Sequence, residues 1–455
     1  MFDLFEISKS GLLAHSKNIE IAGQNITNAS TPGYTRQDAI LSPQAFYGRN
    51  GEMTGLGVRV TDVRRIRSEL IDIQIRERSN IETALKGELN VFERLQNVFT
   101  TNTPNDIDVA INNMFDSYSI LTANPESFSL RQEAIRSTQN TVDQFKRIAG
   151  EFQNLETLIQ QETASNVSEI NRIIKDISRL DNAITLSSAD GRQQDNRALD
   201  VRNQKLRELG DIVALDYNTD VNNSLTLRIG SIVVLQNGRQ TNIRHVFDPI
   251  NNTNQIKLES GKVLFNPGGR IGANIKAYEE TIPFYEDQVN QLAVNLKDAM
   301  NKLHLEGKGI DDNGSRALFN STSRSAFTLS LNQDIVDNVN HLALSLTNDA
   351  PGNSDNAARI ANLRNDQATM GSSGFTEFAL NLQQSAGGRV NSLRSELETA
   401  AATRELFENQ QEDLAGVSID EELANILKFQ NAYQASARVM NTAQTVFDSL
   451  LSVVR

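Results

Sequence analysis

The chain has 455 residues, of which 38% are hydrophobic, enough for several helical layers with modest cores. Its formal net charge of -13 at pH 7 disfavours nucleic acid and anionic membranes as partners, because both are negatively charged. The chain contains no cysteine, which excludes disulfides and thiolate sites, and it has no run of ~20 apolar residues that would predict membrane insertion.

A helix is predicted at the N terminus, where apolar residues recur at an interval of seven and form one seam, as in a coiled coil. This first seam has too few apolar neighbours for a core of its own, so it requires a partner. Acidic residues near Met1 argue against a secretory signal peptide, so the protein either stays in the cytoplasm or uses another exporter. The seam residues are Phe5, Leu12, Ile19 and Ile26.

A turn motif follows this helix and predicts where it ends. Asparagines there tolerate left-handed backbone geometry, and a Pro-Gly pair is typical of the centre of a type II turn. The motif residues are Asn25, Asn28, Thr31, Pro32, Gly33 and Tyr34.

Helical periodicity dominates residues 61–205. A helix is predicted from about Ile66 to Phe99 and a break near residues 100–105, after which three-four spacing from Leu130 to Leu186 predicts a very long helix or two in series. We expect six arginines on the first of these helices, either as a site for an acidic neighbour or as a solvated face. They are Arg59, Arg64, Arg65, Arg67, Arg76 and Arg78.

Residues 206–275 have a different period. Leu225, Leu227 and Ile229 alternate with polar residues, while Asn237-Gly238 and Ser260-Gly261 are typical of tight hairpin turns. Helical periodicity then returns in residues 276–414. We therefore predict a small antiparallel β domain inserted between two helical halves.

A second seam marks the C-terminal helix. Ser418 and Glu421 fit a capping box, in which the serine hydroxyl caps the helix and the glutamate side chain reaches back. This helix either pairs with the first seam or with copies of itself, or it is an ordinary amphipathic helix on its own core. The second seam comprises Ile419, Leu423, Ile426, Tyr433, Met440, Phe447, Leu451 and Val454.

These elements predict a mainly α fold with an inserted β domain. The terminal helices form a paired coiled coil from residues 1–60 and 415–455, a long-helix bundle takes residues 61–205 and 276–414, and the β domain takes residues 206–275. We expect no catalytic, metal-binding or cofactor-binding residues, because the four histidines lack ligand spacing and the glycine-rich turns lack phosphate-loop or calcium-loop patterns.

The turn motif resembles the signature of bacterial flagellar axial proteins, the family of rod, hook and hook-associated subunits. Further stretches resemble the hook-associated members and their helical domain, and the resemblance covers nearly the whole chain. These stretches are Thr35-Arg36-Gln37, Gly55-Leu56-Gly57-Val58, Asn124-Pro125, Arg131-Gln132, Asp200 with Arg202-Asn203-Gln204, Asp420-Glu421-Glu422-Leu423-Ala424-Asn425, Phe429-Gln430-Asn431-Ala432-Tyr433 and Ala437-Arg438-Val439.

The resemblance implies a structural, non-catalytic subunit of the junction ring between flagellar hook and filament. It implies export by the flagellar type III apparatus to an extracellular position, an inner layer of terminal helices and an outward-facing β domain. The implied partners are hook protein, the second junction protein, copies of the chain in a ring, and an export chaperone on the C-terminal helix. A rod or hook subunit, a coiled-coil scaffold unrelated to flagella, and a hydrolase in the middle region are the alternatives.

Overall fold

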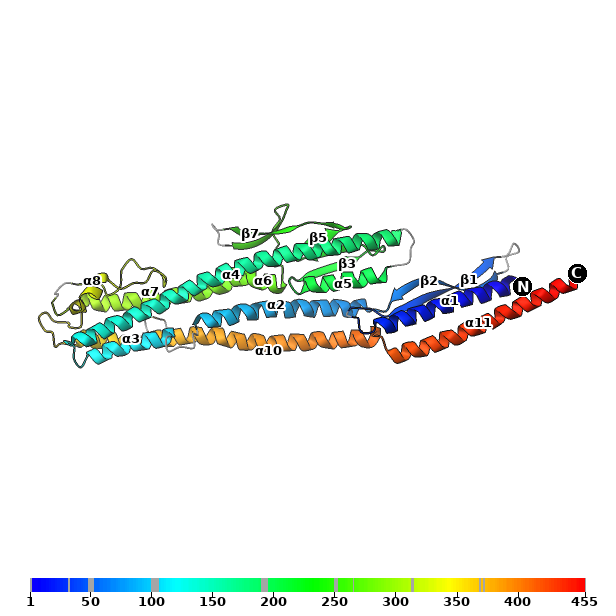
Figure 1. The fold of residues 1–455 in the computed structure, drawn as a ribbon. Helices are drawn as coiled ribbons and strands as arrows, with labels where there is room; N and C mark the ends of the chain where they lie inside the picture. The colour runs from blue at the N-terminus through cyan, green and yellow to red at the C-terminus, as the bar shows by residue number, and fades with distance from the viewer. Residues whose placement is uncertain are drawn as a thin grey trace.

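The computed structural model describes residues 2–31, 33–47, 53–99, 106–189, 195–248, 253–264, 266–311, 315–367, 370 and 373–454. The chain forms a long helical rod that carries a pair of terminal helices at one end and small sheets along one side (Figure 1). The predicted fold class, mainly α with an inserted β domain, is confirmed. Pro32 lies outside the described residues.

Long helices build the rod, because their apolar residues recur with helical spacing. One of them, α4, is a single uninterrupted helix of 62 residues. The rod helices are α2 (Glu69–Phe99), α3 (Ile107–Leu121), α4 (Phe128–Ala189), α5 (Asn196–Gly210), α6 (Gly269–Lys276), α7 (Ile282–Glu306) and α10 (Phe375–Ala415), with a π-helical turn at Ala277–Thr281 between α6 and α7.

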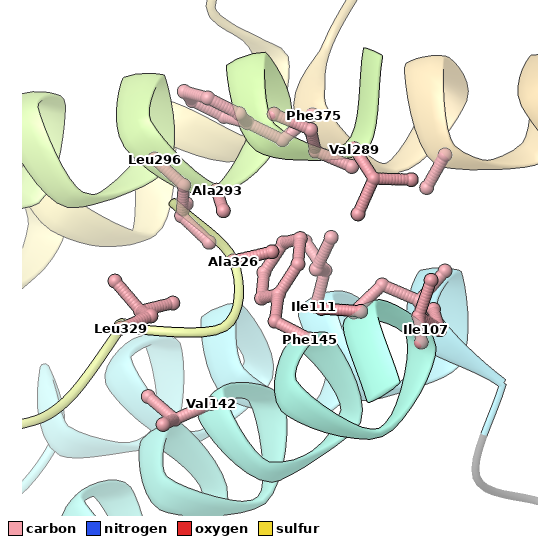
Figure 2. Packing of buried hydrophobic residues seen from close by; sticks show 14 of the residues in the cluster. Ile107, Ile111, Val142, Phe145, Val289, Ala293, Leu296, Ala326, Leu329 and Phe375 are labelled. Atoms are coloured by element: carbon pink, nitrogen blue, oxygen red, sulfur yellow. The ribbon is translucent and has the colours of Figure 1, made fainter. Parts of the chain in front are cut away.

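The main core of the rod lies where α3, α4, α7 and α10 meet. Ile111, Phe145 and Val289 approach one another from three of these helices, and Phe375 at the start of α10 lies nearby (Figure 2). All four side chains are buried, and Phe145 has no exposed surface. At ~25 cal/mol per Å² of apolar area removed from water, such burial dominates the stability of this part of the chain.

The segment between α7 and α10 differs from the predicted run of long helices. It is mostly irregular, with two short helices, α8 (Gln333–Asp337) and α9 (Asp355–Asn362). Buried polar side chains of α7 fix it: Asn301 bonds the backbone of Phe319 in both directions, and His304 accepts from the Ala343 N–H at 3.0 Å. Backbone groups of an irregular segment need such partners when they are buried.

The β domain lies against α4 and α5 and has a separate core. Its four-stranded antiparallel sheet has the order β3-β4-β5-β6, and β7 and β8 form a second hairpin. The predicted turn at Asn237-Gly238 is confirmed, since both residues have positive φ, as a two-residue hairpin turn of type I′ requires. The strands are β3 (Leu215–Thr219), β4 (Leu225–Ile229), β5 (Ile232–Gln236), β6 (Arg239–Gln240), β7 (Ile243–Asp248) and β8 (Thr253–Leu258).

A hairpin near the N terminus is absent from the sequence prediction. Strands β1 (Gln37–Tyr47) and β2 (Met53–Arg65) pair antiparallel and lie along the first helix. The prediction that the six arginines lie on one helix is therefore wrong. Arg59, Arg64 and Arg65 belong to β2, Arg67 follows it, and only Arg76 and Arg78 lie on α2.

The terminal helices are α1 (Phe2–Asn28) and α11 (Ile419–Val454), and they pair with each other, as predicted, in an antiparallel arrangement (Figure 1). Residues from the end of α1 meet the start of α11, since Asn25 bonds Glu422, while further along the pair the rings of His15 and Phe429 stack at 6.3 Å. Gly11 approaches Ser436 closely enough that a Cβ there would lie 2.9 Å from the serine Oγ. The two ends of the chain thus form one rod-like extension (Figure 1).

Candidate functional site

The interface between α1 and α11 contains mostly small and polar side chains, with the stacked rings of His15 and Phe429 among them. On α11, contacts with α1 are made by Glu422, Phe429 and Ser436, which recur every seven positions, as in a coiled coil. This series lies three residues after the predicted series of Ile419, Ile426 and Tyr433. The buried residues of α1, which packs against both α11 and the β1/β2 hairpin, are Ser8, Ala14, Asn18, Ile21, Ala22 and Asn25, and those of α11 are Glu422 and Ala443. The pair therefore buries few large apolar side chains.

The predicted seam residues lie beside this interface and are partly exposed. Leu12, Ile19, Ile26, Ile426 and Met440 are half-buried. The other described seam residues each expose between 40% and 52% of their surface: Phe5, Ile419, Leu423, Tyr433, Phe447 and Leu451. The side chain of Val454 lies outside the described part of the chain. Contact of this stripe with other subunits stays a prediction.

The turn motif forms a polar joint at the base of the terminal pair. Asn25 is buried at the end of α1, where its Oδ1 accepts from the Tyr34 hydroxyl at 2.8 Å and from the Gln37 N–H at 3.0 Å. Its Nδ2 donates to the Gln37 carbonyl at 2.9 Å. Asn25 thereby ties the helix end to the start of β1.

The turn itself has the expected geometry at its described residues. The Tyr34 N–H donates to the Thr31 carbonyl at 3.1 Å, and Gly33 has φ of 80°, as the second central position of a type II turn requires. Asn28 bonds back to the Gln24 carbonyl within its own helix. Asn25 thus makes the long-range contact of the motif, to Glu422, and Tyr34 bonds Asn25 within it, while Asn28, Thr31 and Gly33 shape the chain.

Arg36 connects the joint to α11. Its guanidinium contacts Glu422 at 2.7 Å and Glu421 at 3.1 Å. The capping box is therefore only half correct: the Ser418 hydroxyl accepts from the Glu421 N–H at 3.4 Å, but the Glu421 carboxylate turns to Arg36 instead of back to the helix start. Two guanidinium nitrogens of Arg36 contact one oxygen of the buried Glu422 carboxylate, and this charge pair holds the start of α11 against the turn.

Helix α5 of the rod completes the joint. The buried Asp200 carboxylate accepts from the Thr35 hydroxyl at 2.9 Å and from Arg65 at 3.0 Å. One turn earlier, Asn196 donates to the Val63 carbonyl at 2.9 Å and to the Gln37 side chain at 3.1 Å. These bonds join the rod to both the turn and the hairpin.

The electrostatics of the joint favour a neutral Tyr34. Burial, followed by the nearby Asp200 and Glu422 carboxylates, raises the pKa of Tyr34 to about 12. The phenol therefore remains a hydrogen-bond donor to Asn25 over the physiological pH range.

A cavity of about 600 Å³ lies next to this site, between the turn, α2, α5 and the end of α10. Gly33, Asn80, Arg207 and Gln411 are among the residues that line it.

Comparison with known proteins identifies the family. A family model described as the helical domain of the flagellar hook-associated protein FlgK matches residues 92–319. The chain belongs to the FlgK family of flagellar hook-associated proteins. A second family model, described as the C-terminal part of the flagellar basal body rod FlgEFG proteins, matches residues 414–453 of this FlgK-family chain. The resemblance read from the turn motif is thereby confirmed.

Several relatives of this FlgK-family chain carry the name flagellar hook-associated protein 1. That of Salmonella typhimurium is 23% identical over 559 residues, with 100% of both chains covered. That of Escherichia coli is 25% identical over 553 residues, again with 100% of both covered, and that of Bacillus subtilis is 23% identical, covering 98% of this chain and 97% of the relative.

The hook junction protein FlgK of Burkholderia pseudomallei is a similar solved structure. It has 18% sequence identity and a TM-score of 0.49, and the match covers 54% of this chain and 46% of that one. This FlgK-family chain thus spans less than half the length of that structure.

Two further observations concern other kinds of site. Among the described residues of this FlgK-family chain, no group of three or more histidine, aspartate or glutamate side chains is arranged to hold a metal ion. Within the same ranges, no helix is both long and apolar enough to cross a membrane.

Proposed function

We propose that this chain is a structural subunit of the ring between the flagellar hook and filament, and that it adapts one to the other. The observation that carries the proposal is the match over the full chain to proteins named flagellar hook-associated protein 1. The terminal helices support it physically, because a pair with small residues inside and large apolar residues outside suits an assembly subunit.

The proposed partners follow from that arrangement. Copies of the chain cover the exposed stripe of Phe5, Leu423 and Phe447 in a ring, and hook protein and the second junction protein bind at its two ends. In the proposed domain division, residues 1–60 with 415–455 form the inner layer, residues 61–205 with 276–414 form the rod, and residues 206–275 face outward. Burying each large exposed side chain contributes roughly 1.5 to 3 kcal/mol to such contacts.

Export is part of the proposal. Before assembly, an apolar stripe on α11 is a hazard for aggregation, and an export chaperone on this helix would cover it. The route is the flagellar type III apparatus, and the final position is extracellular, at the junction. The role is structural rather than enzymatic, in keeping with the family.

The test is removal of the protein from the flagellated cell that makes it, followed by electron microscopy. Cells that keep hooks but lack attached filaments, and shed filament subunits into the medium, support the proposal. Cells without hooks would instead point to a rod or hook subunit. Normal flagella would point to a scaffold unrelated to flagella. Re-expression of the intact chain is the control.

A further inference from the structure

The cavity next to the joint is lined mainly by helices of the rod. Its walls come from α2, α5 and the end of α10, with α2 between the other two helices, and the turn closes one edge (Figure 1). Its volume of about 600 Å³ falls within the range of roughly 300–1,000 Å³ that is typical of ligand pockets. The cavity therefore has room for a long side chain of another molecule.

Several hydrogen-bond acceptors of this cavity lack donors. The side-chain oxygens of Asn80 on α2 and Gln411 on α10 are buried, and neither accepts a hydrogen bond from the described residues. The Asp211 and Glu412 carboxylates also line the cavity, and neither side chain has a hydrogen bond or ion pair within the described part of the chain. Because buried acceptors are nearly always paired in folded proteins, the cavity fits a cation with several N–H donors.

The arginines of the cavity do not neutralise these two carboxylates. Four arginines line it, and one of them, Arg207, lies at the edge that the turn forms, where a Cβ on Gly33 would lie 3.3 Å from its guanidinium. The other three pair with other carboxylates: Arg67 with Asp72, Arg76 with Asp216, and Arg404 with Glu82. Asp211 and Glu412 are thus left for a cation from outside the chain.

The opposite side of α2 carries a cation without a partner. Arg78 is exposed, and it makes no ion pair with any described residue. It lies two residues after Arg76 and two before Asn80, both of which line the cavity. At about 100° per residue, Arg78 points about 200° away from each of them. The unpaired cation and the unpaired acceptors therefore lie on opposite sides of one helix.

Large apolar side chains accompany Arg78 on this side. Leu70 and Ile81 of α2 point about 120° and about 140° away from Arg76. Leu406 and Leu414 of α10 are each two residues from a glutamate that lines the cavity, so they too point to the other side of the helix pair. All four expose between 45% and 68% of their surface. An arginine among exposed apolar side chains is typical of the centre of a protein interface.

The positions of the two sides suit a ring. A contact between two different patches of identical subunits closes into a ring when it is repeated by rotation. Arg78 stands between Arg76 and Asn80 in the chain, so the two sides lie at the same height along the rod. Rotation about an axis roughly parallel to the rod therefore brings the Arg78 side of one copy against the cavity of the next.

We propose that the Arg78 guanidinium of one copy enters the cavity of the neighbouring copy in the assembled ring and binds Asp211 and Glu412 there. The inference rests on the proposed function and adds to it the residues of one contact between subunits. Leu70, Ile81, Leu406 and Leu414 surround this contact and exclude water from it.

The chain has no native cysteine, so introduced cysteines can be linked selectively in assembled flagella. Glu77→Cys marks the Arg78 side and Glu405→Cys the cavity side, because Glu77 lies four residues before Ile81 and Glu405 seven before Glu412, and both are exposed. Flagella isolated from cells that carry both changes in one chain are treated with a short bismaleimide. We expect a ladder of linked dimers, trimers and larger species on a denaturing gel.

Glu77→Cys with Gln410→Cys is the matched control. Gln410 is exposed but lies two residues before Glu412, so it points to the Arg78 side of α10, and no link between copies is expected. Adding Arg78→Glu to the first pair should lower the yield of linked species about tenfold, because like charges would then face each other across the contact. Adding Glu412→Arg as well should restore the yield.

Three results would overturn the inference and leave the proposed function in place. They are hooks that carry the first cysteine pair but give only monomers, a control pair that links copies equally well, and a yield that the charge reversal does not change. A parent chain that never reaches the hook tip would instead contradict the proposed function, and this inference with it. Immunogold labelling of hook tips separates these cases.

Discussion

The rod and the terminal pair use similar helices in opposite ways. In the rod, Phe145 and Ile111 are completely buried between helices of the same chain. In the terminal pair, Leu423 and Phe447 are about half exposed, and Ala22 and Asn25 occupy the interface instead. Folding stability comes largely from apolar area removed from water. The rod buries its apolar side chains within one chain, whereas the terminal pair can bury much of its apolar surface only against a partner.

The largest expected effect contrasts the two regions directly. Phe145→Ala in the rod should lower the free energy of unfolding by about 3 to 5 kcal/mol, because it opens a cavity in a packed core. Leu423→Ala on α11 should change it by less than about 0.5 kcal/mol, because that side chain is already half in water. Urea unfolding followed by circular dichroism measures both, and similar losses would show that the two regions are packed alike.

A pH effect of similar size should come from the rod. Burial lowers the pKa of His304 to about 4, from an ordinary value of 6.5. Its Nδ1 bonds the Arg316 carbonyl at 2.7 Å and its Nε2 accepts from the Ala343 N–H, so the folded chain holds the neutral ring. The unfolded chain takes up a proton first as the pH falls, so this stability is complete above pH 6.5 and is lost toward pH 4.

The expected loss is about 3 kcal/mol over that window. Unfolding at about pH 7 and about pH 5 should show a steeper decline in the parent chain than in His304→Gln, which has no ionisable group at this position. His341→Gln is the control, because the His341 ring lies nearer the surface, in the segment that His304 of α7 bonds. Equal slopes in the parent and in His304→Gln would contradict the prediction.

A smaller effect is expected where the hairpin meets α1. Gly57 has φ of 94°, and a Cβ there would collide with the Ser10 hydroxyl and lie 3.2 Å from the Ile7 Cα. Gly57→Ala should cost about 1 to 3 kcal/mol locally, from backbone strain and from lost contact with α1. Hydrogen exchange should accelerate in β2 and α1 but not in the rod.

Gly55→Ala is the matched control, because a Cβ at Gly55 has no atom within 4 Å. It lies two residues earlier on the same strand. If both alanine variants exchange at the same rate as the parent chain, the hairpin is not held by its close approach to α1.

The sequence predicts the helices of the rod well, but it does not predict the β1/β2 hairpin or the irregular segment after α7. Long helices have a regular apolar period, so α4 and α7 follow from spacing alone. The hairpin of β1 and β2 has no such signal, because irregular pairing at Ile40/Leu41 and Gln44/Ala45 breaks the alternation. The segment after α7 is likewise fixed by buried side chains such as His304, which periodicity does not detect.

The joint illustrates the same limit at the candidate site. The turn motif was readable, because Pro-Gly and asparagine have strong local preferences. The long-range contacts of the joint are not predictable from the sequence, because Asn25 and Glu422 are 397 positions apart and Thr35 and Asp200 are 165 apart. Asp200 lay in a stretch that resembled the family, but only the fold reveals that it holds the turn. Local turn preferences can be predicted from a single sequence, whereas the partners in a buried polar network become known only from the folded structure.

Substitutions in the exposed stripe of α11 should have the smallest effect on the free energy of unfolding but a large effect on assembly. Changing Leu423 and Phe447 together to serine should alter the free energy of unfolding by no more than about 0.5 kcal/mol per site, because both are exposed in the free chain. If neighbouring copies cover them in the ring, the same change forfeits roughly 2 kcal/mol or more at each site in every subunit. We therefore expect a folded, exported protein that fails to hold filaments, seen as bare hooks by electron microscopy. Asn431→Ser with Asn441→Ser is the control, since both asparagines are exposed polar residues of the same helix. Filaments that attach normally to the Leu423/Phe447 variant would mean that this stripe faces water in the assembly as well, and that other surfaces of the terminal pair join the subunits.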